Sequence, residues 1–145
     1  MFVAKDKPFA YKDENDLIGK KGVTNQGESY GNDFDAFIKD KLTVARTDGV
    51  DAAFKELLAG NADYLIAGYY SGLAEAAKEG IKDKIEPLSP AILEAEMFVA
   101  FSKKSRCTAL ADKFGRAITE MTTDGSFDAI LAKATADWDA AQAKQ

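Results

Sequence analysis

One segment of the chain combines a glycine, a hydroxyl side chain and a predicted helix start. The run Asn25-Gln26-Gly27-Glu28-Ser29-Tyr30-Gly31 follows a strand-like stretch and precedes apolar residues at helical spacing. Glycine permits close backbone approach, and the free N–H groups of a helix start suit an anion such as a carboxylate. The run matches neither GxxxxGK(S/T) nor GxGxxG, so a nucleotide is not indicated. The alternative is that Ser29 is only an N-cap and Gly27 only a turn residue.

Glu28 works against an anion in this segment. Its own carboxylate complements the helix dipole by roughly 0.3–1 kcal/mol and needs no ligand to explain it. At ~4 Å and an effective dielectric constant of about 20, it would repel an incoming carboxylate by about 4 kcal/mol. An anion site here therefore requires Glu28 to point away or to bind a cationic group.

Two further loops follow predicted strands. Thr47 or Asp48 is expected to be the N-cap of the next helix. The run Gly68-Tyr69-Tyr70-Ser71 puts two aromatic rings at the carboxyl end of a buried strand. These rings either line a cleft or only pack against the fold, because aromatic side chains carry large apolar areas.

Composition excludes several classes of function. The 145 residues include no histidine, which removes Ser-His-Asp and Cys-His nucleophiles and His-containing zinc sites. With 24 Asp and Glu residues, no particular pair supports paired-carboxylate catalysis. A net charge of −5 offers no basic patch for nucleic acid. The single cysteine, Cys107, has no partner thiol and is expected to be a small, partly buried residue. No catalytic residue, metal ligand or cofactor is predicted.

Strand-like and helix-like patterns alternate along the chain. Apolar residues such as Val50, Phe54 and Leu57 recur at helical spacing, whereas short apolar runs bounded by glycine indicate strands. Strands are predicted over 1–4, 22–25, 42–46, 64–67, 84–88 and 96–101, and helices over 30–38, 50–58, 70–79, 110–121 and 127–138.

This alternation predicts an α/β fold with a mostly parallel central sheet between layers of helices, a three-layer sandwich. In such sheets ligands bind beyond the carboxyl ends of the strands, where the loops described above lie. No apolar run approaches the ~20 residues that a membrane span needs. Length and composition together predict one soluble domain with a real core.

Several motifs resemble the extracellular solute-binding proteins of family 3, which deliver polar amino acids to ABC importers. Asp16-Leu17-Ile18-Gly19-Lys20-Lys21 followed by the run from Asn25 is similar to the "DLkGKkvgvqkGtsy" entry to the family's second lobe. Residues 54–63 resemble "ea..aLlaGrvDa", and 100–133 resemble the closing "afsKkS…la.kfn.al..l..dGt…il.k". Each motif alone is weak, but their order and spacing are fairly specific.

The resemblance implies the fold of a type II periplasmic-binding-protein lobe. Residues 1–19 would be a crossing strand and linker, and residues 20–95 the second lobe. Residues 96–145 would hold a return strand over 97–101 and two C-terminal helices that normally pack on lobe one. Most of lobe one would lie outside this chain, and a signal peptide is expected upstream because such proteins are periplasmic.

The resemblance also implies a non-enzymatic function and a ligand site. The expected solute is a polar amino acid or a similar small carboxylate, bound in a cleft between lobes, and the expected protein partners are ABC importer membrane subunits. The family's carboxylate-contacting loop corresponds to Asn25, Gln26, Gly27, Glu28, Ser29 and Tyr30. Gly68 stands where an acid often holds the ligand's ammonium group, and Tyr69 or Glu28 would compensate. Asp63 matches a family Asp and is expected to be structural.

Two other functions stay open at this point. The C-terminal helices would expose apolar stripes through Phe114 and Trp138, so the chain could be a sensor or interaction module that forms a homodimer. Cyclohexadienyl dehydratases resemble the same family, although no matching catalytic constellation is visible in this sequence.

Overall fold

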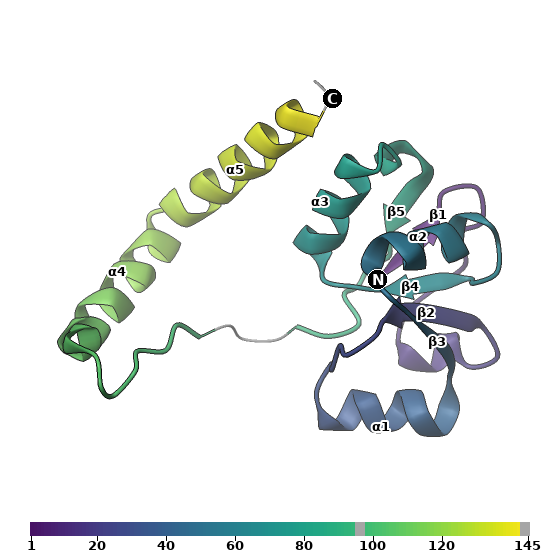
Figure 1. Cartoon of the computed structure of the whole chain (residues 1–145), viewed down its shortest axis with the longest axis horizontal. Helices are drawn as coiled ribbons and strands as arrows, with labels where there is room; N and C mark the ends of the chain where they lie inside the picture. The colour runs from purple at the N-terminus through teal and green to yellow at the C-terminus, as the bar shows by residue number, and fades with distance from the viewer. Residues whose placement is uncertain (95–97, 143–145) are drawn as a thin grey trace. The chain divides into compact units, whose positions relative to one another are not determined.

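The computed structural model describes residues 1–94 and 98–142, which fall into two compact units (Figure 1). The first unit is Met1–Glu94 and the second is Ala95–Gln145. Nearly all of the buried side chains lie in the first unit, where a mixed sheet carries helices on both faces. The α/β fold predicted from the alternating pattern is therefore confirmed.

Five strands form the sheet of the first unit, in the order β3-β2-β4-β1-β5. Strand β2 pairs in parallel with both β3 and β4, whereas β1 runs antiparallel to its neighbours β4 and β5. The sheet is thus mostly parallel, with one reversed strand inserted near its edge. The strand bounds are β1 Phe2–Ala4, β2 Lys21–Asn25, β3 Thr43–Thr47, β4 Tyr64–Ile66 and β5 Ile85–Pro87.

Helices cover the two faces of this sheet (Figure 1). Helix α1 (Asn32–Lys41) lies on one face, and α2 (Val50–Leu58) and α3 (Tyr69–Lys78) lie on the other. Successive side chains of a strand point to opposite faces, so each strand supplies both cores. Short 3-10 turns, η1 (Glu14–Leu17) and η2 (Lys82–Lys84), precede β2 and β5.

The core beneath α2 and α3 is built around two phenylalanines. Phe2 of β1 is fully buried and meets the ring of Phe54 from α2 edge to face, with ring centroids 5.8 Å apart. Burying such a side chain stabilises the fold by about 1.5–3 kcal/mol. Gly72 of α3 allows this packing, because a Cβ atom there would lie 2.4 Å from the Phe2 ring.

The core beneath α1 contains Phe34 and Ile38 of that helix together with Val3, Tyr64 and Ile66 from the strands. Tyr64 is fully buried, and its ring lies directly over Gly22 of β2, where a Cβ atom would come within 2.5 Å of it. Its hydroxyl has no hydrogen-bond partner among the described residues. Burial raises the pKa of Tyr64 to about 12, with a smaller contribution from the charge of Asp63.

The second unit is helical from residue 106 onward, over its described residues. A 3-10 turn η3 (Arg106–Leu110) leads into α4 (Ala111–Thr123), and α5 (Ser126–Gln142) follows after Gly125, whose φ is +77°. Helix α4 packs against η3 and α5, yet neither helix has a buried residue. No helix among the described residues is long and apolar enough to cross a membrane.

Two expectations for this unit are wrong where the structure describes it. Residues 98–101 form no strand, and Phe98 is 82% exposed. Residues 96 and 97 of that predicted strand lie outside the described residues. Cys107 is exposed rather than partly buried, and no residue of η3 is buried.

Candidate functional site

The carboxyl edge of the parallel strands is where the predicted site residues meet. Strands β2, β3 and β4 end there, and each is followed by a loop that leads into α1, α2 or α3. All three helices are N-capped by glycine, at Gly31, Gly49 and Gly68, and no side chain caps any of them. Thr47 and Asp48 are therefore not the N-cap of α2, because the chain continues to Gly49 with a φ of +100° before the helix begins.

The β2–α1 loop, residues 26–31, is fixed to its neighbours by backbone groups. Arg46 of β3 donates from Nη1 to the carbonyl oxygens of Asn25, at 3.3 Å, and Glu28, at 2.9 Å. The Asn25 side chain accepts from the amide of Gly49 at 2.9 Å, and Gln26 donates its amide to the Thr47 carbonyl at 2.8 Å. The loop is thus held in place without any ligand.

Ser29 does not cap α1, contrary to the alternative based on residue type. Its hydroxyl donates to Oδ2 of Asp35 at 2.6 Å, and the amide of Tyr30 donates to Oδ1 of the same carboxylate at 3.0 Å. These bonds, the one from Ser29 first, hold the pKa of Asp35 below its usual value. Gly27 is a turn residue with a φ of +83°, as that alternative expected.

Tyr30 turns toward the sheet rather than toward solvent. Its hydroxyl donates to the carbonyl of Ile66 at 3.0 Å, and the fully buried Thr24 hydroxyl donates to the same carbonyl at 3.0 Å. The two hydroxyls also contact one another. Burial raises the pKa of Tyr30. Tyr30 therefore ties the loop to the ends of β2 and β4, and its phenol is not free for a ligand.

Gly68 and Tyr69 lie at the end of β4, on the same edge. Tyr69 and Tyr70 are 52% and 55% exposed, and their rings meet edge to face with centroids 5.0 Å apart. The two rings thus pack against one another at the surface, beside the start of α3. That one of them also lines a cleft stays a prediction.

Negative charge dominates this edge of the sheet. Glu28 is exposed in the β2–α1 loop, and the first turns of α1 and α2 carry further carboxylates, whereas α3 has none in its first turn. The guanidinium of Arg46 is directed at backbone carbonyls. The acidic residues at the edge are Glu28, Asp33, Asp35, Asp48 and Asp51.

Three residues that sequence reasoning did not single out shape the site: Thr24, Asp35 and Arg46. An arginine was visible in the predicted strand 42–46, but nothing in the sequence showed which carbonyls it would reach. Asp63, by contrast, acts as expected. It accepts from the Lys21 amide at 2.7 Å and fixes the start of β2, away from the site.

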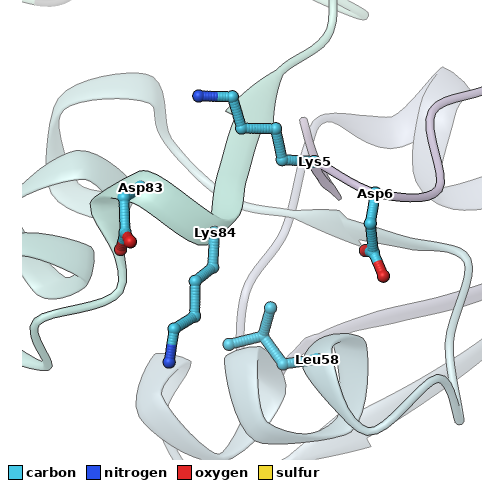
Figure 2. Close-up of a pocket in the computed structure, with 5 residues that line it drawn as sticks. All are labelled: Lys5, Asp6, Leu58, Asp83 and Lys84. Carbon is cyan, nitrogen blue, oxygen red and sulfur yellow. The ribbon is translucent and has the colours of Figure 1, made fainter.

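A shallow surface pocket of about 540 Å³ lies at the other edge of the sheet, where β1 ends and β5 begins (Figure 2). Lys5 and Lys84 extend to different sides of it, and Asp6 and Asp83 flank them. Charges of both signs alternate around Leu58, so the pocket favours no one class of ligand. Among the described residues no group of three or more metal-ligating side chains gathers.

Solved structures similar to the chain are arginine-binding proteins. A mutant of ArgBP from T. maritima has a TM-score of 0.59 and 27% identity, over 91% of this chain and 55% of its own. An ancestral arginine-binding protein bound to glutamine has a TM-score of 0.59 and 24% identity, over 91% and 57%. Domain 2 from TmArgBP has a TM-score of 0.48 and 29% identity, over 59% and 87%.

No family model matches the sequence, and no curated protein matches it. The chain spans little more than half the length of the first two solved proteins, 55% and 57%. These neighbours confirm the resemblance to solute-binding proteins and the lobe fold that it implied. The ligands named for these proteins are theirs, and binding of such a ligand by this chain is a proposal.

Proposed function

We propose that this chain is the solute-binding lobe of a periplasmic receptor that delivers a polar amino acid to the membrane subunits of an ABC importer. It acts by binding and not by catalysing a reaction. The solute lies against the carboxyl edge of β2, β3 and β4, with the loop Asn25–Tyr30 on one side and Gly68–Tyr69 on the other. A second lobe, implied by the resemblance, covers the far side of the solute.

The observation that carries the proposal is the preformed, exposed edge itself. The β2–α1 loop is held by Arg46 and Asn25, yet Gln26, Gly27, Glu28 and Ser29 stay exposed. Strands β1 and β4, by contrast, are buried along their whole length. An exposed edge whose loop is already held in place suits one half of a ligand cleft. Less conformational entropy is lost on binding when the contacting groups are preorganised.

Charge narrows the solute class within this proposal. Five carboxylates surround the edge, and the one guanidinium among them is directed at carbonyls. Opposite charges attract across a partly desolvated cleft, so a solute with a positive group is favoured over an anionic one. The similarity to a T. maritima arginine-binding protein agrees with this preference.

Calorimetric titration of the chain with a panel of amino acids tests the proposal. Gly27→Val forces a side chain onto the loop at a φ of +83°, with no atom nearby to clash. Gly80→Val is the matched control, since Gly80 has a φ of +64° and open space around it at the end of α3. Both changes strain the backbone, but only Gly27→Val is expected to lower affinity. Equal loss in both variants would contradict the site, as would unchanged binding in Gly27→Val.

A second candidate function follows from the second unit. Phe114 and Ile118 of α4 and Phe127, Ile130 and Trp138 of α5 are between 36% and 58% exposed. Exposed apolar helix faces favour association, so a homodimer through these helices is proposed beside solute binding.

The molar mass measured by light scattering tests the homodimer, on the unaltered chain, on Phe114→Ser and on a control variant of an exposed residue, Glu120→Ser. The unaltered chain is expected to dimerise and Phe114→Ser to shift toward monomer, whereas a concentration-independent monomer mass would contradict it.

A further inference from the structure

We infer that the outer edge of β3 is an interaction surface at which two copies of the chain pair antiparallel, centred on Ala45, into one continuous sheet. The surface consists of the backbone of residues 43–47 and of the charged side chains at its two ends, Lys41 and Asp48. All of these residues belong to the first unit. The surface is therefore separate from the association proposed for α4 and α5, and it needs no solute.

Strand β3 is the last strand on its side of the sheet, and no described strand pairs with its outer edge (Figure 1). Its five residues, Thr-Val-Ala-Arg-Thr, include β-branched types that favour strands, and no proline or glycine. Its one charged residue, Arg46, directs Nη1 at the carbonyls of Asn25 and Glu28. Strand β3 thus lacks the proline or lysine with which proteins often prevent pairing at an edge.

The opposite edge strand, β5, is protected where β3 is not. It has three residues against the five of β3, and it directly follows Lys84. It ends at Pro87, which has no backbone N–H to donate to a further strand. Of the two edges of the described sheet, β3 is therefore the one that offers an extended strand for pairing.

The direction of the backbone groups of β3 determines the register. The Thr47 carbonyl accepts from the amide of Gln26, so the odd-numbered residues of β3 direct their backbone groups toward β2. Successive residues of a strand alternate in this direction, so the N–H and C=O groups of Val44 and Arg46 face outward. In an antiparallel pair centred on Ala45, Val44 of one copy lies opposite Arg46 of the other. Two residues that both face outward exchange two hydrogen bonds, and the two-fold symmetry repeats them.

The side chains of the edge are complementary to themselves at this register. Ala45 is exposed, so neither neighbouring helix covers its methyl group. Lys41 and Asp48 lie at opposite ends of the strand, and both are exposed without an ion pair among the described residues. Antiparallel pairing brings Lys41 of each copy beside Asp48 of the other, so opposite charges meet twice. This charge complementarity favours a second copy of the chain as the partner.

Disulfide formation between introduced cysteines tests this register. Ala45→Cys, made together with Cys107→Ser, places two thiols opposite one another, with Cβ atoms about 4.5–5.5 Å apart. Thr43→Cys is the matched control, because residue 43 is also exposed on β3 but lies away from the two-fold centre. With oxidised glutathione, Ala45→Cys is expected to form the covalent dimer several-fold faster than Thr43→Cys, since distant cysteines cannot bridge. Equal rates, or no link at residue 45, would overturn the inference.

Charge reversal tests the two ends of the pair. Lys41→Glu sets like charges side by side and is expected to slow the link at residue 45 several-fold. Adding Asp48→Lys restores opposite charges and is expected to restore the rate. Lys12→Glu is the control, because it changes the net charge equally at an exposed position outside β3. No recovery in the double variant, or equal slowing by Lys12→Glu, would contradict the pairing.

The same link measured in Phe114→Ser separates this surface from the helices of the second unit. The rate is expected to stay unchanged, because α4 takes no part in the pairing of β3. Loss of the link in Phe114→Ser would show that the helices bring the copies together, and the inference would be overturned. Should Ala45→Cys not fold, light scattering on Phe114→Ser with and without Ala45→Lys replaces it. Two ammonium groups then meet at the two-fold centre, and a lower molar mass is expected; an unchanged mass would count against the inference.

Discussion

Both units contain helices with a stripe of apolar side chains, but the stripe is buried in the first unit and much more exposed in the second. Phe54 of α2 is 1% exposed, whereas Phe114 of α4, also on the apolar stripe of its helix, is 42% exposed. Helix α2 lies on a sheet that supplies Phe2 and Leu65, whereas the described contacts of α4 are with η3, α5 and the ring of Phe101. The difference shows that an amphipathic stripe predicts a helix and not the surface that covers it.

This contrast locates the stability of the chain. Isolated helices are marginal in water, and most helical stability in proteins comes from packing an apolar face. The first unit has such packing on both faces of its sheet, and the described part of the second has little. We expect the two units to respond separately to substitution. All five tyrosines precede residue 95, and the one tryptophan, Trp138, is in α5, so fluorescence can follow each unit.

The largest expected effect on stability is that of Phe54→Ala, compared with Phe114→Ala in the second unit. Phe54→Ala should lower the free energy of unfolding of the first unit by about 3–5 kcal/mol, because it leaves a cavity beside Phe2. Phe114→Ala should cost under about 1 kcal/mol, since much of its ring is already in water. Urea denaturation followed by tyrosine and tryptophan fluorescence measures both. An equal loss of unfolding free energy in the two variants would contradict the difference in packing between the units.

Glycine to alanine substitutions in the two units form the next pair. In Gly72→Ala the new Cβ meets the Phe2 ring at 2.4 Å, so α3 must shift. A loss of about 1–3 kcal/mol is expected from such overpacking. In Gly115→Ala of α4 nothing lies within 4 Å, and the higher helix propensity of alanine should add up to about 1 kcal/mol. Thermal unfolding by circular dichroism measures both, and a stabilising Gly72→Ala would show that α3 does not pack as described.

A pH-dependent effect is expected at Tyr64, in the first unit alone. Its pKa is raised to about 12 in the folded chain, against about 10 for an exposed tyrosine. A raised pKa means that the folded state holds its proton more tightly. The stability from this group is therefore present below about pH 10 and lost as the pH rises toward about 12, by up to roughly 2–3 kcal/mol.

Tyr64→Phe removes both this titration and a buried hydroxyl without a partner among the described residues. At neutral pH the variant should be about 1 kcal/mol more stable, because an unsatisfied buried polar group is costly. Between about pH 10 and 12 its stability should fall less than that of the unaltered chain. Denaturation curves across this range test the point, and parallel pH profiles for the two chains would contradict it.

Much of the first unit was predictable from spacing alone. The apolar runs around Val23 and Leu65 and the stripe Val50-Phe54-Leu57 are strong patterns, and the strands and helices predicted there are confirmed. The reversed direction of β1 was not predicted, because residues 1–4 carry no signal for the direction in which they pair. The strand predicted over 96–101 failed at 98–101, since an apolar run needs a neighbouring strand.

The candidate site was predicted less completely. The loop Asn25–Tyr30 and the pair Gly68–Tyr69 do lie at one edge of the sheet, because parallel strands bring their carboxyl ends together. The bonds of Ser29 and Tyr30 to Asp35 could not be predicted from residue types. Their geometry depends on where α1 begins, and Gly31 rather than Ser29 sets that start.

A map of amide chemical-shift changes on adding L-arginine tests the central claim most directly. The proposal predicts that the changes gather at residues 25–31, 48–49 and 67–70, at the carboxyl edge of the sheet. It predicts none at Lys5, Asp6, Asp83 and Lys84, which line the pocket at the other edge. Changes centred on that pocket, or on α4 and α5, would contradict the claim that this chain binds solute at the carboxyl edge of β2, β3 and β4.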